Sequence, residues 1–475
     1  MNQHPKAKIF PDNVDAALNN KTLQGTLRRV SGGFVEKRAV ARNNLPEFDD
    51  LRDAARDMKN HTLEHLDLYL EDYEHAVTNA GGHVHWAENI QDAQQIVLDI
   101  CADAKAKTIC KGKSMVTEEI ELNHALEGAG YEVIETDLGE YIIQLRHETP
   151  SHIIAPAVHV NKEQVEQEFR AAHSQLDPNR RFADSSSLVQ EARQVLREKY
   201  FRADVGVTGA NMLIAETGQS VIVTNEGNGD LTQSLARIHI VVASLEKVVP
   251  TLDDATTVLR VLARSATGQP ITSYTTFSNG PRRIDDPDGP QEYHVVLVDN
   301  GRSLMLGSDF QDMLRCIRCG ACMNHCPVYQ AVGGHAYGSV YPGPMGAVLT
   351  PALTGIDESG HLPNASTFCG RCEAVCPMRI PLPKMMRHWR EREFDKNLSP
   401  PVVRYGLSFW GFFAKRPKLY HFCTSWANQL LRIFANGKGR FSYMPLMGGW
   451  TRYRDMTAPQ APTFQRQWSQ HKRRT

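Results

Sequence analysis

The spacing of apolar residues predicts an amphipathic helix over residues 63–77. The apolar positions, which recur every three or four residues, are Leu63, Leu66, Leu70, Tyr73 and Val77. This spacing places them on one face of a helix and the polar residues on the other. The pattern therefore predicts a helix that packs on a larger core.

Residues 81–300 alternate between short strand-like runs and helical patterns. The strand-like runs are GGHVHW from Gly81, YEVIETD from Tyr131, HIIAPAV from His152, VIVTN from Val221, HIVVAS from His239 and EYHVVLVDN from Glu292. The helical patterns between them include NIQDAQQIVLDICADA from Asn89 and LVQEARQVLREKYF from Leu188. This alternation predicts an α/β domain with a largely parallel sheet.

Two glycine-containing loops of this domain are candidates for a ligand site, because parallel sheets bind ligands beyond the carboxyl ends of their strands. They are GVTGANMLIAETGQS, with Gly206, Gly209 and Gly218, and TNEGNGDL, with Glu226, Gly227 and Gly229. Neither loop matches the G-x-G-x-x-G fingerprint or a phosphate-binding P-loop. Glycine turns between strands are also common for structural reasons alone. Lys111-Gly-Lys113-Ser114, after an expected strand, is open to the same two interpretations.

Beyond residue 300 the informative pattern is one of cysteines. CIRCGACMNHCPVYQ, from Cys316, fits C-x2-C-x2-C-x3-C-P, the run of bacterial two-cluster ferredoxins. STFCGRCEAVCPMRIP keeps this spacing but has Ser366 where the first cysteine would stand. In such runs three cysteines hold one cluster and the fourth reaches the other. The predicted ligands are Cys316, Cys319, Cys322 and Cys376 for cluster 1, and Cys326, Cys369 and Cys372 for cluster 2.

The metal and the last ligand of cluster 2 have alternatives. Zinc would need four ligands from two C-x2-C elements, a scheme that seven cysteines with two Cys-Pro endings fit poorly. Ser366 could bind the last iron through its oxygen, or a water or His361 could replace it. The cluster could also hold three irons, or leave one iron open to a partner or substrate. We expect two clusters of the [4Fe-4S] type.

A second metal pattern lies near the predicted helix over residues 63–77. His61, Glu64 and His65 match the H-x-x-E-H pattern of zinc proteases. At 100° per residue, both histidines face away from the apolar stripe. We therefore interpret them as solvent-facing residues.

The cysteine-containing segment is predicted to be mainly helical. AVGGHAYGSVYPGPMGAVLTPALTG is a Gly/Pro-rich loop that leads into a short helical stretch. PKMMRHWREREF, which begins at Pro383, has a composition that favours helix. We expect an α-helical ferredoxin domain with its clusters between helices.

From Leu398 the chain is aromatic and basic. LSPPVVRYGLSFWGFFAKRPKLYHFCTSWANQLLRIF holds two apolar stretches, each too short to cross a bilayer. From Arg379 to the end, 19 Lys or Arg stand against 4 Asp or Glu, whereas residues 1–378 hold 34 and 50. Three interpretations stay open for the stretches: packing within the chain, packing on a partner helix, and contact with an anionic membrane surface. Cys423 is interpreted as a buried thiol.

Composition indicates a folded chain of two or three domains. Of the 475 residues, 41% are apolar and 23% charged, which excludes disorder as the main state. No apolar run reaches the roughly 18 residues of a membrane span, and MNQHPKAKIFPDN lacks the apolar core of a signal peptide. We expect a cytoplasmic protein that is soluble or attached to the inner face of the membrane. Seven of the ten cysteines fall within residues 316–376, which favours metal binding over disulfides.

This order of elements resembles the lactate utilization protein B family, the iron-sulfur subunits of three-component L-lactate utilization systems. The resemblance covers nearly the whole chain and rests on GVTGANMLIAETG, VTNEGNGDL, CIRCGACMNHCPVY, YPGPMGAVLTPAL, CGRCEAVCPMRIP and MGGWTRYRDM. It implies that the α/β region is a lactate-utilization domain related to the CoA-transferase and ribose-5-phosphate isomerase folds. It also implies that the seven motif cysteines hold the clusters and that the serine at Ser366 is a feature of the family.

The resemblance implies a complex that oxidises L-lactate to pyruvate. Its two companion subunits would be one that is cysteine-rich and one with a related α/β domain, and electrons would pass through the two clusters to an acceptor such as quinone. No flavin or nicotinamide fingerprint is visible, and nothing resembles a helix that reads nucleic acid. Two other hypotheses stay open: a CoA-transferase-like enzyme with Glu226 as nucleophile, and an iron-sulfur redox sensor.

The predicted organisation has four parts. They are an N-terminal segment over residues 1–60, an α/β lactate-utilization domain over 61–300, an α-helical ferredoxin domain over 301–395 and a helical, aromatic and basic C-terminal region over 396–475. The sequence predicts no catalytic residue for the α/β domain.

Overall fold

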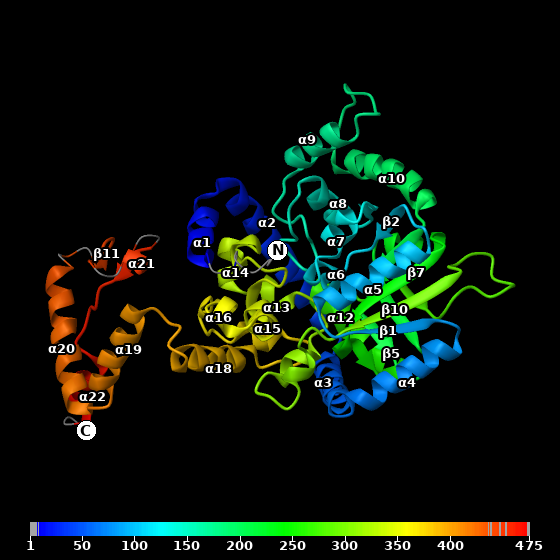
Figure 1. Ribbon diagram of the computed structural model, residues 1–475. Helices are drawn as coiled ribbons and strands as arrows, with labels where there is room; N and C mark the ends of the chain where they lie inside the picture. The colour runs from blue at the N-terminus through cyan, green and yellow to red at the C-terminus, as the bar shows by residue number, and fades with distance from the viewer. Residues whose placement is uncertain are drawn as a thin grey trace. The chain divides into compact units, whose positions relative to one another are not determined.

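The computed structural model describes residues 7, 9–435, 437, 439–445, 448–451 and 454–472. Residues 1–6 and 8 of the N-terminal stretch, Met447, Arg452 and Tyr453 of MGGWTRYRDM, and the last three residues lie outside this description. The chain divides into two compact units, Met1–Glu393 and Phe394–Thr475, each of which is described by itself (Figure 1).

A six-stranded parallel sheet forms the centre of the first unit. Its strand order is β1-β10-β7-β4-β2-β3, and every neighbouring pair is parallel. The strands are β1 (His83–Ala87), β2 (Thr108–Lys111), β3 (Glu132–Glu135), β4 (Val205–Thr208), β7 (Ile238–Ser244) and β10 (Glu292–Val298). All residues of β7 are buried, as expected where helices cover both faces of a parallel sheet. The predicted α/β domain with a parallel sheet is confirmed.

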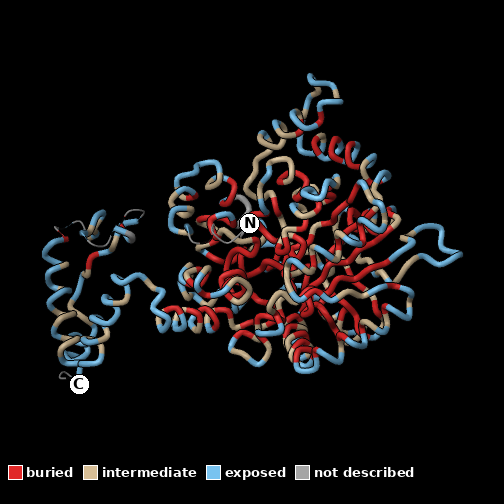
Figure 2. Tube along the Cα trace, viewed as in Figure 1, coloured by how far each residue is buried: buried red, intermediate tan, exposed pale blue. Residues whose placement is uncertain are grey.

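Helices cover both faces because the side chains of each strand alternate between them. Val241 and Ala243 of β7 pack into one core, whereas Ile240 and Val242 pack into the other. The helices of this region are α3 (Phe48–Glu64), α4 (Leu66–Asn79), α5 (Ile90–Asp103), α6 (Met115–Glu119), α7 (Leu122–Gly128), α8 (Leu138–Leu145), α9 (Lys162–Ala172), α10 (Ser185–Arg202), α11 (Asn228–Leu235) and α12 (Leu252–Ala266). Helices α3, α4 and α12 contribute to the first core, and α5, α6 and α7 to the second. Buried residues gather at the centre of the first unit (Figure 2).

A second sheet of four strands has mixed directions. Its order is β8-β5-β6-β9, in which β5 and β8 are parallel and the other pairs antiparallel. The strands are β5 (Met212–Ile214), β6 (Gln219–Thr224), β8 (Val248–Val249) and β9 (Tyr274–Ser278). Gly218, with a φ of +69°, makes the turn between β5 and β6. The strand predicted at VIVTN is β6 and thus belongs to this smaller sheet.

Two predicted elements differ from the structure. The strand predicted at HIIAPAV is wrong: the backbone N–H groups of Ile154 and Ala155 donate to Nδ1 of His152 (2.9 and 3.2 Å), which curls the chain. The helix predicted over residues 63–77 is divided at His65, whose φ is −127°. All five apolar residues are nevertheless buried, so the pattern identified the buried face and missed the break.

Short helices make up the cysteine-containing segment. They are α13 (Ala321–Asn324), α14 (Pro327–Val332), α15 (Gly343–Thr354), α16 (Ile356–Ser359), α17 (Arg371–Val375) and α18 (Leu382–Asp395). The N-terminal helices α1 (Phe10–Asn19) and α2 (Lys21–Asn43) pack on this segment, and Nε2 of Gln24 donates to the carbonyl oxygen of Ala331 (2.8 Å) (Figure 1). The predicted helical character of this segment is confirmed.

The second unit is built mainly of helices. Its elements are α19 (Pro401–Ala414), α20 (Pro417–Phe434), β11 (Arg440–Phe441), α21 (Gly448–Thr451), β12 (Met456–Thr457) and α22 (Phe464–Lys472). Neither α19 nor α20 contains a buried residue, so the two apolar stretches do not form a core of this unit. Cys423 is half-buried, and the prediction of a buried thiol is therefore wrong. Among the described helices, none combines the length and apolar character that a bilayer crossing requires.

Candidate iron-sulfur sites and an adjoining cavity

Four cysteines from both motifs line one small cavity, which we call the cluster 1 site. They are Cys316, Cys319, Cys322 and Cys376. Ile153, Met345 and Leu382 also line this cavity, and all of these cysteines except Cys316 are buried. The structure thus brings together the four residues that spacing groups as one ligand set.

The other three motif cysteines line a second cavity, which we call the cluster 2 site. They are Cys326, Cys369 and Cys372. Ser366 and His325 also line it, so oxygen and nitrogen donors lie beside the three sulfur atoms. The first motif therefore contributes three cysteines to the cluster 1 site and its fourth to the cluster 2 site, whereas the second contributes two to the cluster 2 site and its last to the cluster 1 site. Ligation by individual residues stays a prediction.

The donor groups of both sites fit iron-sulfur clusters. All ten cysteines are free thiols. Burial raises the pKa of Cys319 and Cys372 to about 12 and that of Cys376 to about 11. These groups would remain thiols unless a metal centre stabilised the thiolate. Four converging sulfur donors in one site and three in the next are the donor set of two such clusters.

Two buried arginines bind the backbone beside the cluster 1 site. Arg52 donates from Nε and Nη2 to the carbonyl oxygen of Cys376 (3.0 and 2.7 Å) and from Nη2 to that of Ala374 (2.8 Å). Arg38 donates from Nη2 to the carbonyl oxygen of Val375 (2.7 Å). Arg38 comes from α2 and Arg52 from α3, and both fix the end of α17, where Cys376 lies. No motif in the sequence indicates them.

The cluster 2 site has one cysteine exposed to solvent. Cys369 is exposed, and the backbone N–H of Arg371 lowers the pKa of its thiol. Oγ of Ser366 accepts a hydrogen bond from the backbone N–H of Phe368 (3.1 Å). His361 does not line this cavity: its Nε2 donates to the carbonyl oxygen of Ala7 (2.6 Å). His325, which the sequence analysis missed, does line it, and its position next to Cys326 was the only signal.

A buried ion-pair network joins the cluster 1 site to the α/β domain. Arg318, in the loop of the first motif, donates from Nη2 to Oε1 of Glu246 (3.0 Å). Arg302 pairs with Oε2 of Glu246 (3.0 Å) and donates to both carboxylate oxygens of Glu119 (2.8 and 2.6 Å). Burial opposes ionisation of Glu246, but Arg302 and Arg318 lower its pKa to about 2.

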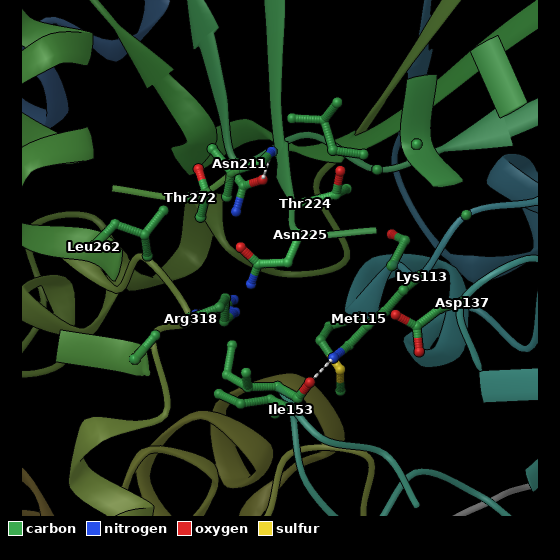
Figure 3. Close-up of a pocket in the computed structure, with 18 of the residues that line it drawn as sticks. Lys113, Met115, Asp137, Ile153, Asn211, Thr224, Asn225, Leu262, Thr272 and Arg318 are labelled. Carbon is green, nitrogen blue, oxygen red and sulfur yellow. Dashed lines mark hydrogen bonds between the residues drawn. The ribbon is translucent and has the colours of Figure 1, made fainter. Parts of the chain in front are cut away.

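A cavity of about 230 Å³ lies beyond the carboxyl ends of the parallel strands (Figure 3). Its polar lining includes Lys113, Asp137, Asn211, Asn225, Lys247 and Arg318. Of the two glycine loops, Gly209 and Gly229 also line it, whereas Gly206 lies in β4 and Gly218 in the β5–β6 turn. Glu226 is exposed at the edge of the cavity. The expectation of a site beyond the strand ends thus corresponds to a real cavity.

The other predicted candidates are Lys111 and the histidines of the H-x-x-E-H pattern, and each makes ordinary structural contacts. Lys111 is buried and paired with Glu118 and Glu135 (2.9 and 2.7 Å), and it does not line the cavity. His61 and His65 are exposed as expected, and Nε2 of His61 is hydrogen-bonded to the hydroxyl group of Tyr69 (3.1 Å).

Comparisons with known proteins agree with this geometry. Residues 70–298 match the LUD domain, residues 312–380 the 4Fe-4S dicluster domain and residues 375–473 the C-terminal region of lactate utilisation protein B. The chain is 42% identical over 468 residues to "Lactate utilization protein B" of Bacillus licheniformis, covering 98% of this chain and 97% of the relative. It is 40% identical over 461 residues to the protein of the same name from Bacillus subtilis, covering 97% and 95%. The chain belongs to the lactate utilization protein B family.

This family assignment confirms the resemblance found in the sequence. The 4Fe-4S dicluster match contains all seven motif cysteines, and iron-sulfur clusters of the 4Fe-4S type are the cofactors of the chain. A crystal structure of a DUF162 family protein from Deinococcus radiodurans shares 14% identity and a TM-score of 0.26, over 49% of this chain and 98% of that one. That likeness is too weak to define the finer fold of the α/β domain.

Proposed function

We propose that the chain is the iron-sulfur electron-transfer subunit of a multi-component system that oxidises L-lactate to pyruvate. The observation that carries this proposal is the pair of adjoining cysteine sites, each of which takes its last cysteine from the other motif. The family name supports lactate as the compound consumed.

The residues of the chain have distinct roles in this proposal. The clusters supply one-electron transfer when they are bound. Cys316, Cys319, Cys322 and Cys376 would hold cluster 1, and Cys326, Cys369 and Cys372 would hold cluster 2, with Ser366 beside the last iron. Arg38 and Arg52 place positive charge near the cluster 1 site, which favours its reduced form.

The proposed electron path runs from the buried cluster 1 site to the more exposed cluster 2 site. Oxidation of L-lactate to pyruvate releases two electrons and two protons, and two one-electron centres are the number needed to take both electrons. The exposed Cys369 makes the cluster 2 site the exit towards an acceptor such as quinone. The basic C-terminal region would support peripheral contact with an anionic membrane.

The proposal includes partners and a domain organisation. Two companion subunits, one cysteine-rich and one with a related α/β domain, would complete the system. The α/β lactate-utilization domain over residues 61–300 would have a fold related to CoA transferases. The N-terminal segment over residues 1–60 would belong functionally to the ferredoxin domain over 301–395, because Arg38 and Arg52 bind its backbone.

Electron paramagnetic resonance (EPR) on the anaerobically purified chain tests this function. We expect about eight irons per chain, as two [4Fe-4S] clusters require, and reduction of both clusters when L-lactate and the companion subunits are added. Omission of one companion subunit serves as the control and should leave the clusters oxidised. Zinc in place of iron, or clusters that stay oxidised in the complete mixture, would contradict the proposal.

A further inference from the structure

A buried lysine lines the cavity beyond the sheet. Lys247 lines the cavity and is 6% exposed. In the part of the chain that the structure describes, its side chain makes no hydrogen bond or ion pair. A buried ammonium group is costly unless an anion compensates for it, so this site favours a negatively charged ligand.

The surrounding network holds three cations, Lys247, Arg302 and Arg318, with the carboxylates of Glu119 and Glu246. Glu119 accepts two hydrogen bonds from Arg302, and Glu246 pairs with both arginines. Among the described residues no carboxylate forms an ion pair with Lys247, although Glu246 and Cys316 both act to raise its pKa. A carboxylate beside Lys247 and Arg318 would therefore supply the ion pair that Lys247 lacks.

A neutral donor lies on another side of the same cavity. Oδ1 of Asn211 accepts a hydrogen bond from the backbone N–H of Val223 (3.0 Å), which fixes the orientation of the amide (Figure 3). Its Nδ2 group donates no hydrogen bond to the described residues and is available to a ligand oxygen. A 2-hydroxy acid offers both features that the cavity can recognise: a carboxylate for the cations and a second oxygen for Asn211.

The volume of the cavity limits the ligand to a small molecule. At about 230 Å³, the cavity is smaller than the roughly 300–1,000 Å³ of pockets for drug-sized ligands. A three-carbon acid fits inside it.

The cavity also adjoins the cluster 1 site. Arg318 is located between Cys316 and Cys319 in the chain and lines the cavity. Ile153 lines both the cavity and the cluster 1 site. A molecule bound here would thus be separated from the cluster 1 site by a single layer of residues.

We propose that this cavity binds a small 2-hydroxy or 2-oxo carboxylate, with its carboxylate on Lys247 and Arg318 and its second oxygen on Asn211, next to the cluster 1 site. The choice of the 2-hydroxy acid as substrate rests on the proposed function. The expectation of a small carboxylate rests on the cavity itself.

Calorimetric titration of the full-length, cluster-loaded chain with L-lactate and pyruvate tests this inference. We expect dissociation constants of about 1 mM or tighter, a range usual for substrates. Propionate, which lacks the second oxygen, should bind more weakly. The visible absorbance of the clusters, recorded on every sample, verifies that each variant is folded and loaded.

Three variants separate a specific site from general attraction of anions. Lys247→Met should weaken L-lactate binding by about tenfold or more, as expected for loss of a charged hydrogen bond. Asn211→Asp keeps the bond to Val223 but replaces the free donor with a carboxylate, so it should weaken binding by a similar factor. The matched control is Lys199→Met, on a half-buried lysine of α10 outside the cavity, which should bind like the unmodified chain.

The possible results distinguish this site from the wider function. Absence of binding to the loaded chain, or unchanged affinity in both Lys247→Met and Asn211→Asp, would overturn the inference. Binding by a chain that passes no electrons with its partners would sustain the inference and remove the proposed function. Electron flow from L-lactate without binding to this chain would place the substrate on another subunit.

Discussion

The cluster 1 site and the cluster 2 site receive cysteines from the same two motifs but lie in different surroundings. In the cluster 1 site, Arg38 and Arg52 bind the backbone at Val375 and Cys376. In the cluster 2 site, Cys369 is exposed. Burial disfavours a charged centre, and nearby cations compensate for the negative charge of a reduced cluster. Cysteines of the same spacing can therefore line two sites that differ in burial and in nearby charge.

The largest expected effect comes from removal of a buried ligand of the cluster 1 site. Cys322→Ala should reduce the iron content from about eight to about four atoms per chain or fewer, because a cubane that loses a buried thiolate is poorly retained. Iron and sulfide analysis measures this loss. Cys423→Ala, in the second unit, is the control and should keep the full content. A full iron content in Cys322→Ala would remove the assignment of this residue.

The second effect concerns the arginine that fixes α17. Arg52→Met removes the hydrogen bonds to Cys376 and Ala374 and should lower the free energy of unfolding by about 3 kcal/mol. Denaturant unfolding followed by circular dichroism measures it. Arg56→Met, on the same helix but paired with the surface residues Asp53 and Asp57, should change stability by only about 0.5 kcal/mol. Equal losses in the free energy of unfolding would show that the hydrogen bonds of Arg52 stabilise the chain no more than a surface ion pair does.

Exposure to air should distinguish the two sites by rate. Because Cys369 is exposed and the ligands of the cluster 1 site are mostly buried, we expect cluster 2 to degrade first and cluster 1 to persist for several times longer. EPR spectra of samples reduced after increasing exposure can follow each cluster. Simultaneous loss of both signals would mean that the difference in burial does not protect cluster 1.

The smallest effect is expected from a variant that supplies the missing eighth cysteine. Ser366→Cys supplies the thiolate that the motif lacks and should change the EPR signal of cluster 2 alone. The iron content should stay at about eight if cluster 2 already has four irons. A rise in iron by one atom per chain would instead indicate a three-iron cluster in the unmodified protein. A change in the signal of cluster 1 would contradict the crosswise grouping of cysteines.

The sequence predicted the parts of the structure that depend on local pattern. Alternating apolar runs identified most strands of the central sheet, and cysteine spacing grouped the residues that line the two cluster sites. The break at His65 was missed because the apolar stripe continues across it. The strand at HIIAPAV was wrong because the side chain of His152 binds the backbone that a strand partner would need.

Features that depend on distant segments could not be predicted. Arg38 and Arg52 lie more than 300 residues before the carbonyl groups that they bind. Lys247 and Arg318 come together only after the α/β domain and the ferredoxin segment have packed. The local sequence LEKVV carries no mark that its lysine will line a cavity.

Arg318 ties the cavity to the loop that carries cysteines of the cluster 1 site. The same short loop carries two of these cysteines and one wall of the cavity. A substitution that moves this loop would therefore alter the linings of both at once, so neither can change independently of the other.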